Sequence, residues 1–476
     1  MARVKQVAFF GLFALLSVST IVQVEGCRVG SHSTIGAKLR SDERRAAALR
    51  YPAGQQPLTA IPLWKENTYY SQGNVVINQG NPYVVWNYPG GISSSGSGPS
   101  GTGPGPISDG TVTWYYDDQP VAGATSQLAP VITDLKTPPA GLSQFYSVTA
   151  QSSDFWFSGG IPSPLPSYPS VVDILPFSDG TMSFETDAPQ FAIKSYGDHP
   201  YQIVVDGRNV FAGGRKGVYG GYINIDFSNA ARKKRDVTLL ISGNVTFEGV
   251  YVDPASTVTA TTQVNTRVCV FGDSITSGGN GFPLVSEDFW PRRVGQMLGW
   301  SDVWNLAEGG TGYINKSPTP GNTNFLGHVG DATNNACELV LFFGGLNDGY
   351  YPDSQLHTAA LKTFQEVRAG LPNAPIIVFG VYASSTGPSA TVIADENAIH
   401  SAVTQFNDPL TWFVPVSTDP AGPWVYGTGF VVNPTGDGNA DSCTSPDGTH
   451  PTEACIIGII APHIARAVSQ VIQQIP

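Results

Sequence analysis

The feature that most constrains the fold of this 476-residue chain is a series of short apolar runs after residue 266. Four of them are Val268–Phe271, Leu339–Phe343, Ile376–Val381 and Trp412–Val416, and a shorter one covers residues 303–306. Each of the four longer runs lacks polar side chains, instead of alternating apolar with polar residues. Such runs are typical of strands that are buried on both faces of a parallel sheet.

Helical stretches lie between these runs, where parallel strands need crossover connections. They cover roughly residues 287–298, 356–370, 394–405 and 453–473. Alternation of strand and helix predicts a doubly wound, flavodoxin-like α/β domain with a five-stranded parallel sheet. We place this domain at residues 263–476.

The chain before residue 263 is rich in turns and short strands, so we expect all-β domains there. The sequence contains 54 glycines and 37 prolines, which indicates many turns. Strand follows strand from residue 181 to residue 258, with turns such as Asp206-Gly207 between them. This pattern predicts a β-sandwich at residues 135–262. No catalytic spacing occurs in it, so we expect an accessory role.

A separate aromatic-rich segment at residues 56–120 predicts a small β module. Its pattern of aromatic strands around a Gly/Ser-rich tract resembles small β modules of chitinases and phage tail proteins. Exposed aromatic rings stack on sugar rings, which makes Trp64, Trp86 and Trp114 candidate glycan-binding residues. The alternative is that these rings form the core of the module itself.

The N-terminus has the pattern of an export signal at residues 1–26. Arg3 and Lys5 precede an apolar run, and Gly26 ends the segment as the small residue before a cleavage site. The alternative is a membrane anchor, although the run is short for a span. We therefore expect a secreted, periplasmic or cell-surface protein. Cys27 follows the cleavage position and is a candidate for lipidation and a membrane tether. Residues 27–55 are expected to form a linker or a short helix.

Charge and cysteine spacing exclude several classes of function. The formal net charge of -12 argues against a nucleic-acid partner, which requires a basic surface. No C-x-x-C pair occurs and the seven histidines are scattered, so no metal site is expected. Cys443 and Cys455 bracket a short segment and form a candidate disulfide. For Cys269 and Cys337 the sequence leaves open buried thiols or a pair.

Four short polar blocks follow in order at the ends of the expected elements. Gly272-Asp273-Ser274 follows the first strand, a block from Asn305 to Gly310 follows the second, Asn347-Asp348 follows the third, and Asp447-Gly-Thr-His450 precedes the last helix. The carboxyl ends of parallel strands meet at one edge of a sheet, where active sites of this fold class form. The blocks are therefore expected to meet.

The type and order of these blocks, over about residues 266–474, resemble the SGNH (GDSL-like) serine hydrolases. The resemblance implies that Ser274 is the nucleophile, that His450 is the general base and that Asp447 orients the imidazole. Serine needs such a base to take its proton as it attacks. No cofactor is implied.

The same resemblance implies an oxyanion hole and two bracing carboxylates. The oxyanion donors would be the backbone N–H groups of Ser274 and Gly310 and the side-chain amide of Asn347. Glycine suits position 310 because the backbone must approach the substrate closely. Asp273 and Asp348 are expected to support these loops by hydrogen bonding.

The order of aromatic module, sandwich and hydrolase is similar to that of carbohydrate esterases with a sandwich before an SGNH domain. The leading hypothesis is an exported serine esterase that hydrolyses O-acyl esters, in particular O-acetyl esters, on a polysaccharide. The alternatives are a lipid esterase or thioesterase, a glycan O-acyltransferase, and a glycan-binding adhesin or receptor with a vestigial hydrolase domain.

Overall fold

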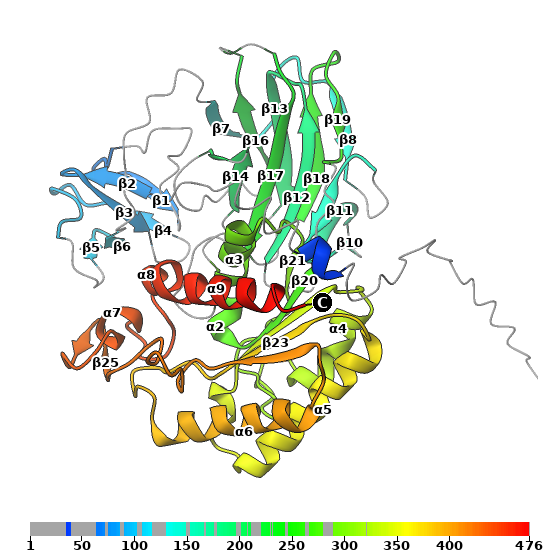
Figure 1. The fold of residues 1–476 in the computed structure, drawn as a ribbon. Helices are drawn as coiled ribbons and strands as arrows, with labels where there is room; N and C mark the ends of the chain where they lie inside the picture. Colours follow the sequence, from blue (N-terminus) through cyan, green and yellow to red (C-terminus); the bar gives the residue numbers. More distant parts are fainter. Residues whose placement is uncertain are drawn as a thin grey trace, which may run out of the picture.

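The computed structural model describes most of the chain from residue 63 onward and one short segment before it. The described residues are 35–39, 63–71, 75–85, 90–101, 107–116, 130–148, 153–165, 168–175, 179–196, 201–206, 208–210, 220–228, 230, 232–242, 246–261, 266–278, 289–319 and 321–475. The expected signal peptide, Cys27 and Trp86 lie outside these residues. Figure 1 shows a small β module beside a stack of long antiparallel strands, with an α/β domain below the stack.

The C-terminal domain contains the expected five-stranded parallel sheet. Its strands, in spatial order, are β21 (Val303–Asn305), β20 (Val268–Gly272), β22 (Leu339–Phe343), β23 (Ile376–Phe379) and β24 (Thr411–Val414). All four pairings between neighbouring strands are parallel. Every residue of β20, β22 and β23 is buried, which explains the uninterrupted apolar runs. The predicted fold class is confirmed.

Helices cover both faces of this sheet (Figure 1). They are α2 (Ser274–Ser277), α3 (Trp290–Leu298), α4 (Val329–Thr333), α5 (Asp353–Gly370), α6 (Ala390–Phe406), α7 (Ala440–Cys443), α8 (Glu453–Cys455) and α9 (Ala461–Ile472), with short helical turns η2 (Phe325–His328), η3 (Leu346–Asp348) and η4 (Ile456–Ile460). One core contains residues of α3 and α9, and the other contains residues of α4, α5 and α6. A two-stranded ribbon, β25 (Gly429–Phe430) and β26 (Asn433–Pro434), lies in the loop before α7.

The strand order places a reversal of direction at β20. The chain runs from β20 to β21 on one side and then returns to β22 on the other side. In doubly wound folds, ligands bind outside the carboxyl ends of the strands at such a reversal. The loop after β20 carries Ser274, so this serine lies where the topology favours a site.

Two antiparallel sheets precede the α/β domain and enclose a core between them. One sheet contains β10 (Ile161–Leu165), β11 (Tyr168–Leu175), β18 (Thr246–Val252), β13 (Gln190–Tyr196), β16 (Gly221–Asp226), β7 (Val131–Leu135) and β8 (Gln144–Ser147). The other contains β15 (Arg208–Asn209), β14 (Tyr201–Val205), β17 (Arg235–Ser242), β12 (Asp179–Thr186), β19 (Val258–Thr259) and β9 (Trp156–Ser158). Buried side chains from both sheets, such as Phe184 and Phe191, share one cluster. The first strand begins at Val131, just before the expected boundary at residue 135.

The aromatic-rich segment forms two small sheets with their own core. One sheet pairs β1 (Tyr69–Ser71) with β4 (Gly90–Ile92), and the other has the order β2 (Val75–Asn78), β3 (Asn81–Val85), β6 (Val112–Tyr116) and β5 (Ile107–Asp109). The Trp114 side chain is 0% exposed, so it cannot stack on a sugar, and its proposed glycan-binding role is wrong. The indole N–H groups of Trp64 and Trp114 both donate to Asp109 Oδ2, at 2.9 and 3.1 Å. Trp64 is half-buried, and its role in glycan binding stays a prediction.

Part of the expected linker is a helix that packs on the α/β domain. Residues 35–39 are helical, and Leu39 is fully buried in the core that contains α3 and α9. Lys38 Nζ forms an ion pair of 2.6 Å with Glu338, directly before β22. The short-helix alternative for this region therefore applies to residues 35–39.

The C-terminal segment Glu453–Ile472 is long and apolar enough to cross a membrane by length and composition. Half of it is buried in the fold, and Ile460, Ile464 and Val468 pack in the core beside the parallel sheet. Its apolar character is therefore accounted for by packing in a core.

Two disulfides join parts of the α/β domain. Cys443 pairs with Cys455, which confirms the expected bridge. Cys269 of β20 pairs with Cys337, two residues before β22, with a sequence separation of 68 residues. Parallel pairing of β20 and β22 brings these two cysteines together, which settles the alternatives that the sequence left open.

We expect the double substitution Cys269→Ala and Cys337→Ala to destabilise the protein by about 4 kcal/mol in the chain-entropy model. The long loop closed by this bridge makes the unfolded state more restricted. Thermal unfolding in the presence and absence of a reductant measures the effect. If the reductant lowered the unfolding midpoint by the same amount in the variant and in the wild type, this assignment would be contradicted.

Candidate active site

Ser274 lies in a sharp turn between β20 and α2. Asp273 caps the helix, because its Oδ1 accepts a hydrogen bond of 2.9 Å from the Ile275 N–H. Ser274 is the first helical residue, so its own N–H has no partner within the helix. A Cβ atom at Gly272 would lie 2.2 Å from Thr276 Oγ1, so only glycine allows α2 to pack this closely on the strand.

The loop that carries His450 is held by several bonds close to the ring. The carboxylate Oδ1 of Asp447 accepts hydrogen bonds from the backbone N–H of Thr449 and of His450, at 2.9 and 3.0 Å. Ser445 Oγ donates to the same oxygen at 2.7 Å. The Cys443–Cys455 disulfide closes the loop around these residues.

These two loops bring Ser274, His450 and Asp447 into one hydrogen-bonded chain. The distance from His450 Nε2 to Ser274 Oγ is 2.8 Å, across 176 residues of sequence. On the other side of the ring, His450 Nδ1 lies 2.6 Å from Asp447 Oδ2. An Nδ1–H that donates to the carboxylate leaves Nε2 free to accept the serine proton. This arrangement can activate the serine as a nucleophile.

The charge of Asp447 is maintained by its neighbours. Partial burial alone would raise the pKa of this carboxyl group. Hydrogen bonds from Ser445, from the His450 ring and from two backbone N–H groups outweigh burial and hold the pKa below its ordinary value. Asp447 therefore remains an anion across the neutral range and can stabilise an imidazolium.

Hydrogen-bond donors lie beside the serine in the loop after β21. An added Cβ at Gly309 would lie 3.8 Å from the Ser274 Cβ, so this loop runs against the serine. Gly310 adopts φ 77°, a conformation that favours glycine. Within the part of the chain that the structure describes, the Gly310 N–H donates to no protein atom. It is thus open to a ligand.

Asn347 lies beside the same two loops. Its side-chain Nδ2 donates to the Thr311 carbonyl at 2.9 Å and makes a longer contact of 3.4 Å with Asp273 Oδ2. One amide proton is therefore held by the loop that carries Gly310. The other makes only a weak contact, which a developing oxyanion can replace.

Asp348 braces the Gly310 loop in the way expected of it. Its carboxylate accepts three backbone N–H bonds, from Tyr313, Ile314 and Asn315, at 2.8 to 3.0 Å. Asn315 Nδ2 in turn donates to the Gly310 carbonyl at 2.6 Å. The loop is thus fixed from both ends.

Two further polar residues support the site, and sequence reasoning assigned a role to neither. Glu396 of α6 is fully buried, and its carboxylate accepts backbone N–H bonds from Val381, Val416, Ser417 and Thr418. It joins the loops after β23 and β24, and nothing in its helical context distinguishes it from a surface residue. Glu308 Oε2 accepts the Thr323 N–H at 2.6 Å, so this side chain is a loop support.

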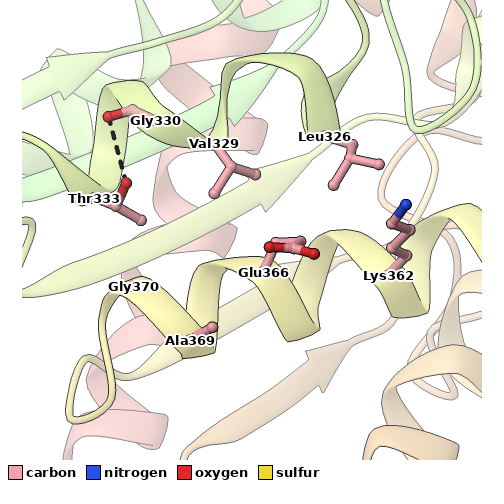
Figure 2. A pocket seen from close by; sticks show the side chains of 8 residues that line it. All are labelled: Leu326, Val329, Gly330, Thr333, Lys362, Glu366, Ala369 and Gly370. Atoms are coloured by element: carbon pink, nitrogen blue, oxygen red, sulfur yellow. Dashed lines mark hydrogen bonds between the residues drawn. The ribbon is translucent and has the colours of Figure 1, made fainter.

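A cavity of about 490 Å³ lies elsewhere, between α4 and α5 (Figure 2). Lys362 and Glu366 of α5 face Leu326, Val329 and the α4 turn across it. None of its lining residues belongs to the Ser274 cluster. The candidate site is therefore defined by its side-chain chemistry and not by this cavity.

Comparison with known proteins identifies a family for the C-terminal domain. Residues 270–454 match the GDSL-like lipase/acylhydrolase family. The C-terminal domain belongs to this family. The matched region contains all four polar blocks that the sequence analysis placed at one edge of the sheet. It begins at the third residue of the first strand, β20. A search of curated proteins gave no match.

Solved structures with the same two-part fold are distant in sequence. A family two carbohydrate esterase from Cellvibrio japonicus has a TM-score of 0.52 at 11% identity, with 70% of this chain and 99% of that chain covered. The salicylyl-acyltransferase SsfX3 of a tetracycline biosynthetic pathway has 0.52 at 14%, with 69% and 98% covered. A family two carbohydrate esterase from Clostridium thermocellum, in complex with cellohexaose, has 0.50 at 16%, with 66% and 99% covered. These likenesses show that a β region before the GDSL domain is part of a shared fold.

The buried carboxyl group of Asp273 gives the GDSL domain a pH-dependent stability. Burial is the main reason why its pKa is raised from 3.8 to about 7; the hydrogen bond from the Ile275 N–H opposes this rise, and the nearby Asp348 charge adds to it. Because the raised pKa belongs to the folded state, the stabilisation that the protonated Asp273 contributes is fully present below about pH 4. This contribution is lost as the pH rises through 7. We expect Asp273→Asn, which retains a capping oxygen, to remove this loss between pH 4 and 8. Chemical unfolding at several pH values measures it, and parallel curves for both proteins would contradict it.

Proposed function

We propose that this protein is an exported serine esterase that removes O-acyl groups, in particular O-acetyl groups, from a polysaccharide. The observation that carries the proposal is the 2.8 Å contact between His450 Nε2 and Ser274 Oγ, with Asp447 on the far side of the ring. Three groups in this order are what a serine needs in order to attack an ester.

In the first half of the reaction, Ser274 Oγ attacks the carbonyl carbon of the ester. His450 Nε2 takes the hydroxyl proton as the new bond forms, and Asp447 stabilises the resulting imidazolium. The imidazolium then gives its proton to the sugar oxygen as the ester bond breaks. The alcohol leaves, and the acyl group remains on Ser274.

The tetrahedral intermediate carries its negative charge on the former carbonyl oxygen. The N–H groups of Ser274 and Gly310 and the Asn347 amide are the donors that we assign to this oxygen. Such donors are effective because they are already oriented before charge develops, and loss of one costs about 10²–10³ in turnover.

In the second half, water replaces the alcohol. His450 takes a proton from the water as it attacks the acyl carbon, and returns the proton to Ser274 Oγ as the acid leaves. The enzyme is then restored. The same acyl-Ser274 can be captured by another hydroxyl group instead of water.

The polysaccharide substrate is supported by the arrangement of the chain. The β-sandwich precedes the GDSL domain, as the sequence predicts, and carbohydrate esterases are among the solved structures with this fold. Two disulfides support an oxidising compartment and therefore export.

Acyl transfer is the second candidate function, because SsfX3, an acyltransferase, shares the fold at a TM-score of 0.52. Water and a sugar hydroxyl compete for the same acyl-enzyme, so the ratio of free acid to acylated acceptor separates the two functions. Nitrophenyl esters of increasing chain length separate both from a lipid esterase, since we expect the highest kcat/KM with acetyl.

We expect the full chain to release acetate from acetylated xylan, chitin or exopolysaccharide, and Ser274→Ala to release none above background. Acetate is measured enzymatically after incubation with each polymer. Ser277→Ala, in the same short helix, is the matched control and retains activity. Equal acetate release by the wild type and by Ser274→Ala would contradict the proposal.

Replacement of Asp447 by Asn keeps the shape of the His450 contact but removes the charge. The amide favours the wrong imidazole tautomer, so we expect kcat for nitrophenyl acetate to fall on the order of 10³- to 10⁴-fold with little change in KM. Ser445→Ala removes one bond to Asp447 and serves as the milder comparison. A loss of less than tenfold in Asp447→Asn would show that the carboxylate does not orient the base.

A further inference from the structure

The carboxylate of Glu396 joins the loops that follow two neighbouring strands of the parallel sheet. Glu396 lies on α6 and is 0% exposed. Its Oε2 accepts hydrogen bonds from the backbone N–H groups of Val381 and Ser417, both at 2.8 Å. Its Oε1 accepts the N–H groups of Val416 and Thr418, at 3.1 and 2.8 Å. Val381 follows β23 and the other three residues follow β24, so one side chain fixes the start of both loops.

The loop after β23 is held at this point from a second side. The Ser417 hydroxyl donates to the Val381 carbonyl at 2.6 Å. A Cβ atom at Gly380 would lie 2.2 Å from Glu396 Oε2, so the backbone passes directly over the carboxylate. The next side chain along the loop, Tyr382, is buried in the core that contains α3 and α9. The loop therefore leaves the carboxylate in a fixed direction.

This loop then reaches the turn that carries His450. The Ser385 N–H donates to the Gly448 carbonyl at 3.1 Å. An added Cβ at Gly448 would lie 3.2 Å from Ser385 Oγ, so the two segments are in contact here. Gly448 lies between Asp447 and His450 in the sequence. A displacement of residues 381–385 would therefore move the turn that joins the imidazole to the carboxylate that orients it.

The Ser385 contact lies at the tip of the His450 loop, whereas the base of the loop is closed elsewhere. At the base, Thr444 pairs with Pro451, and the second disulfide joins the flanking segments. These contacts fix where the loop starts and ends. The direction of its tip relative to the sheet depends on the contact between Ser385 and Gly448.

The arrangement around Glu396 requires a carboxylate. Burial of a charge costs free energy that a neutral side chain avoids. In return, a carboxylate accepts hydrogen bonds at both oxygens, whereas an amide of the same shape accepts at one atom and donates from the other. A glutamine at this position would place its NH₂ group against backbone N–H groups, so it could not hold the four of them.

We propose that Glu396 is a positioning residue for His450, which acts through residues 381–385 and Gly448. Loss of its second acceptor atom releases the loop after β23 and lets the imidazole move from its 2.8 Å distance to Ser274 Oγ. The inference rests on the proposed esterase function, in which His450 is the general base.

The test compares Glu396→Gln in the full chain with Asp302→Asn as the matched control. Asp302 is also a buried carboxylate, and it accepts hydrogen bonds from Trp304 Nε1 and Arg267 Nε at 2.7 and 2.9 Å. It directly precedes β21, so it lies at the end of the sheet opposite to the one that carries Ser274.

We expect Glu396→Gln to lower kcat for nitrophenyl acetate between about 10- and 10²-fold with an unchanged KM, the effect of a small misplacement of the base. Asp302→Asn should lose stability but keep kcat within about twofold, because no contact near the reacting atoms changes. Thermal unfolding midpoints are measured for both variants. Equal kcat losses in the two variants would overturn the positioning role.

A proton spectrum separates positioning from a loss of stability. The Nδ1–H of His450 lies in a short, charge-assisted hydrogen bond of 2.6 Å to Asp447, so its resonance is expected at low field. We expect this resonance to shift or broaden in Glu396→Gln and to stay unchanged in Asp302→Asn. An unchanged resonance in Glu396→Gln would exclude the positioning role, whatever the loss of stability.

Ser417→Ala is the second variant, in case Glu396→Gln does not fold. It removes one hydrogen bond to the Val381 carbonyl and leaves the carboxylate in place. We expect a smaller fall in kcat, about threefold, with a shift of the same His450 resonance. If Ser417→Ala changed neither kcat nor the resonance, the connection through the loop after β23 would be wrong.

A double variant separates this inference from the proposed function. If Glu396 acts through His450, Glu396→Gln should have no further effect on the residual kcat of His450→Ala. Equal fold losses in the wild-type and His450→Ala backgrounds would overturn the inference and leave the esterase proposal intact. Full activity in His450→Ala alone would overturn both.

Discussion

The hydrogen bond between Ser274 Oγ and His450 Nε2 is the interaction on which the rest of the site depends. It joins the first strand of the GDSL domain to the loop before its last helix, across 176 residues. Ser274 begins a helix of a single turn and His450 lies in a loop, so their mutual position comes from what holds each segment. On one side this is the Asp273 cap and the contacts of Thr276, and on the other it is the Asp447 turn and a disulfide.

Several loops of the site are held in the same way, by a buried carboxylate that accepts hydrogen bonds from backbone N–H groups of the loop. Asp348 holds the Gly310 loop in this way, and Glu396 holds the loops after β23 and β24. A carboxylate offers several acceptor positions, so a single side chain can fix three or four successive peptide groups. The resulting loops are rigid where the chemistry needs fixed distances.

The fold of the GDSL domain was predictable because its signals are local and repeated. Uninterrupted apolar runs such as Leu339–Phe343 mark buried strands, and the polar block after each strand falls at the shared edge. The meeting of Ser274, Asp447 and His450 follows from the same logic, since the last two are only three positions apart in one loop. Helix starts were less certain: α6 begins at Ala390 because Ser389 caps it, four residues before the expected start.

The features that the sequence did not predict depend on contacts between segments that are distant in the sequence. Trp114 has the same local context as an exposed aromatic residue, and only the packing of two small sheets shows that it is buried. The Cys269–Cys337 pair follows from the parallel pairing of β20 and β22, which spacing alone does not give.

The most direct test is to trap the acyl-enzyme. The full chain is mixed with nitrophenyl acetate, quenched in acid within milliseconds and digested, and the peptides are analysed by mass spectrometry. We expect one acetyl group on the peptide that contains Ser274, at the serine itself. Turnover without acetylation of Ser274, or with the acetyl group on another residue, would contradict the account.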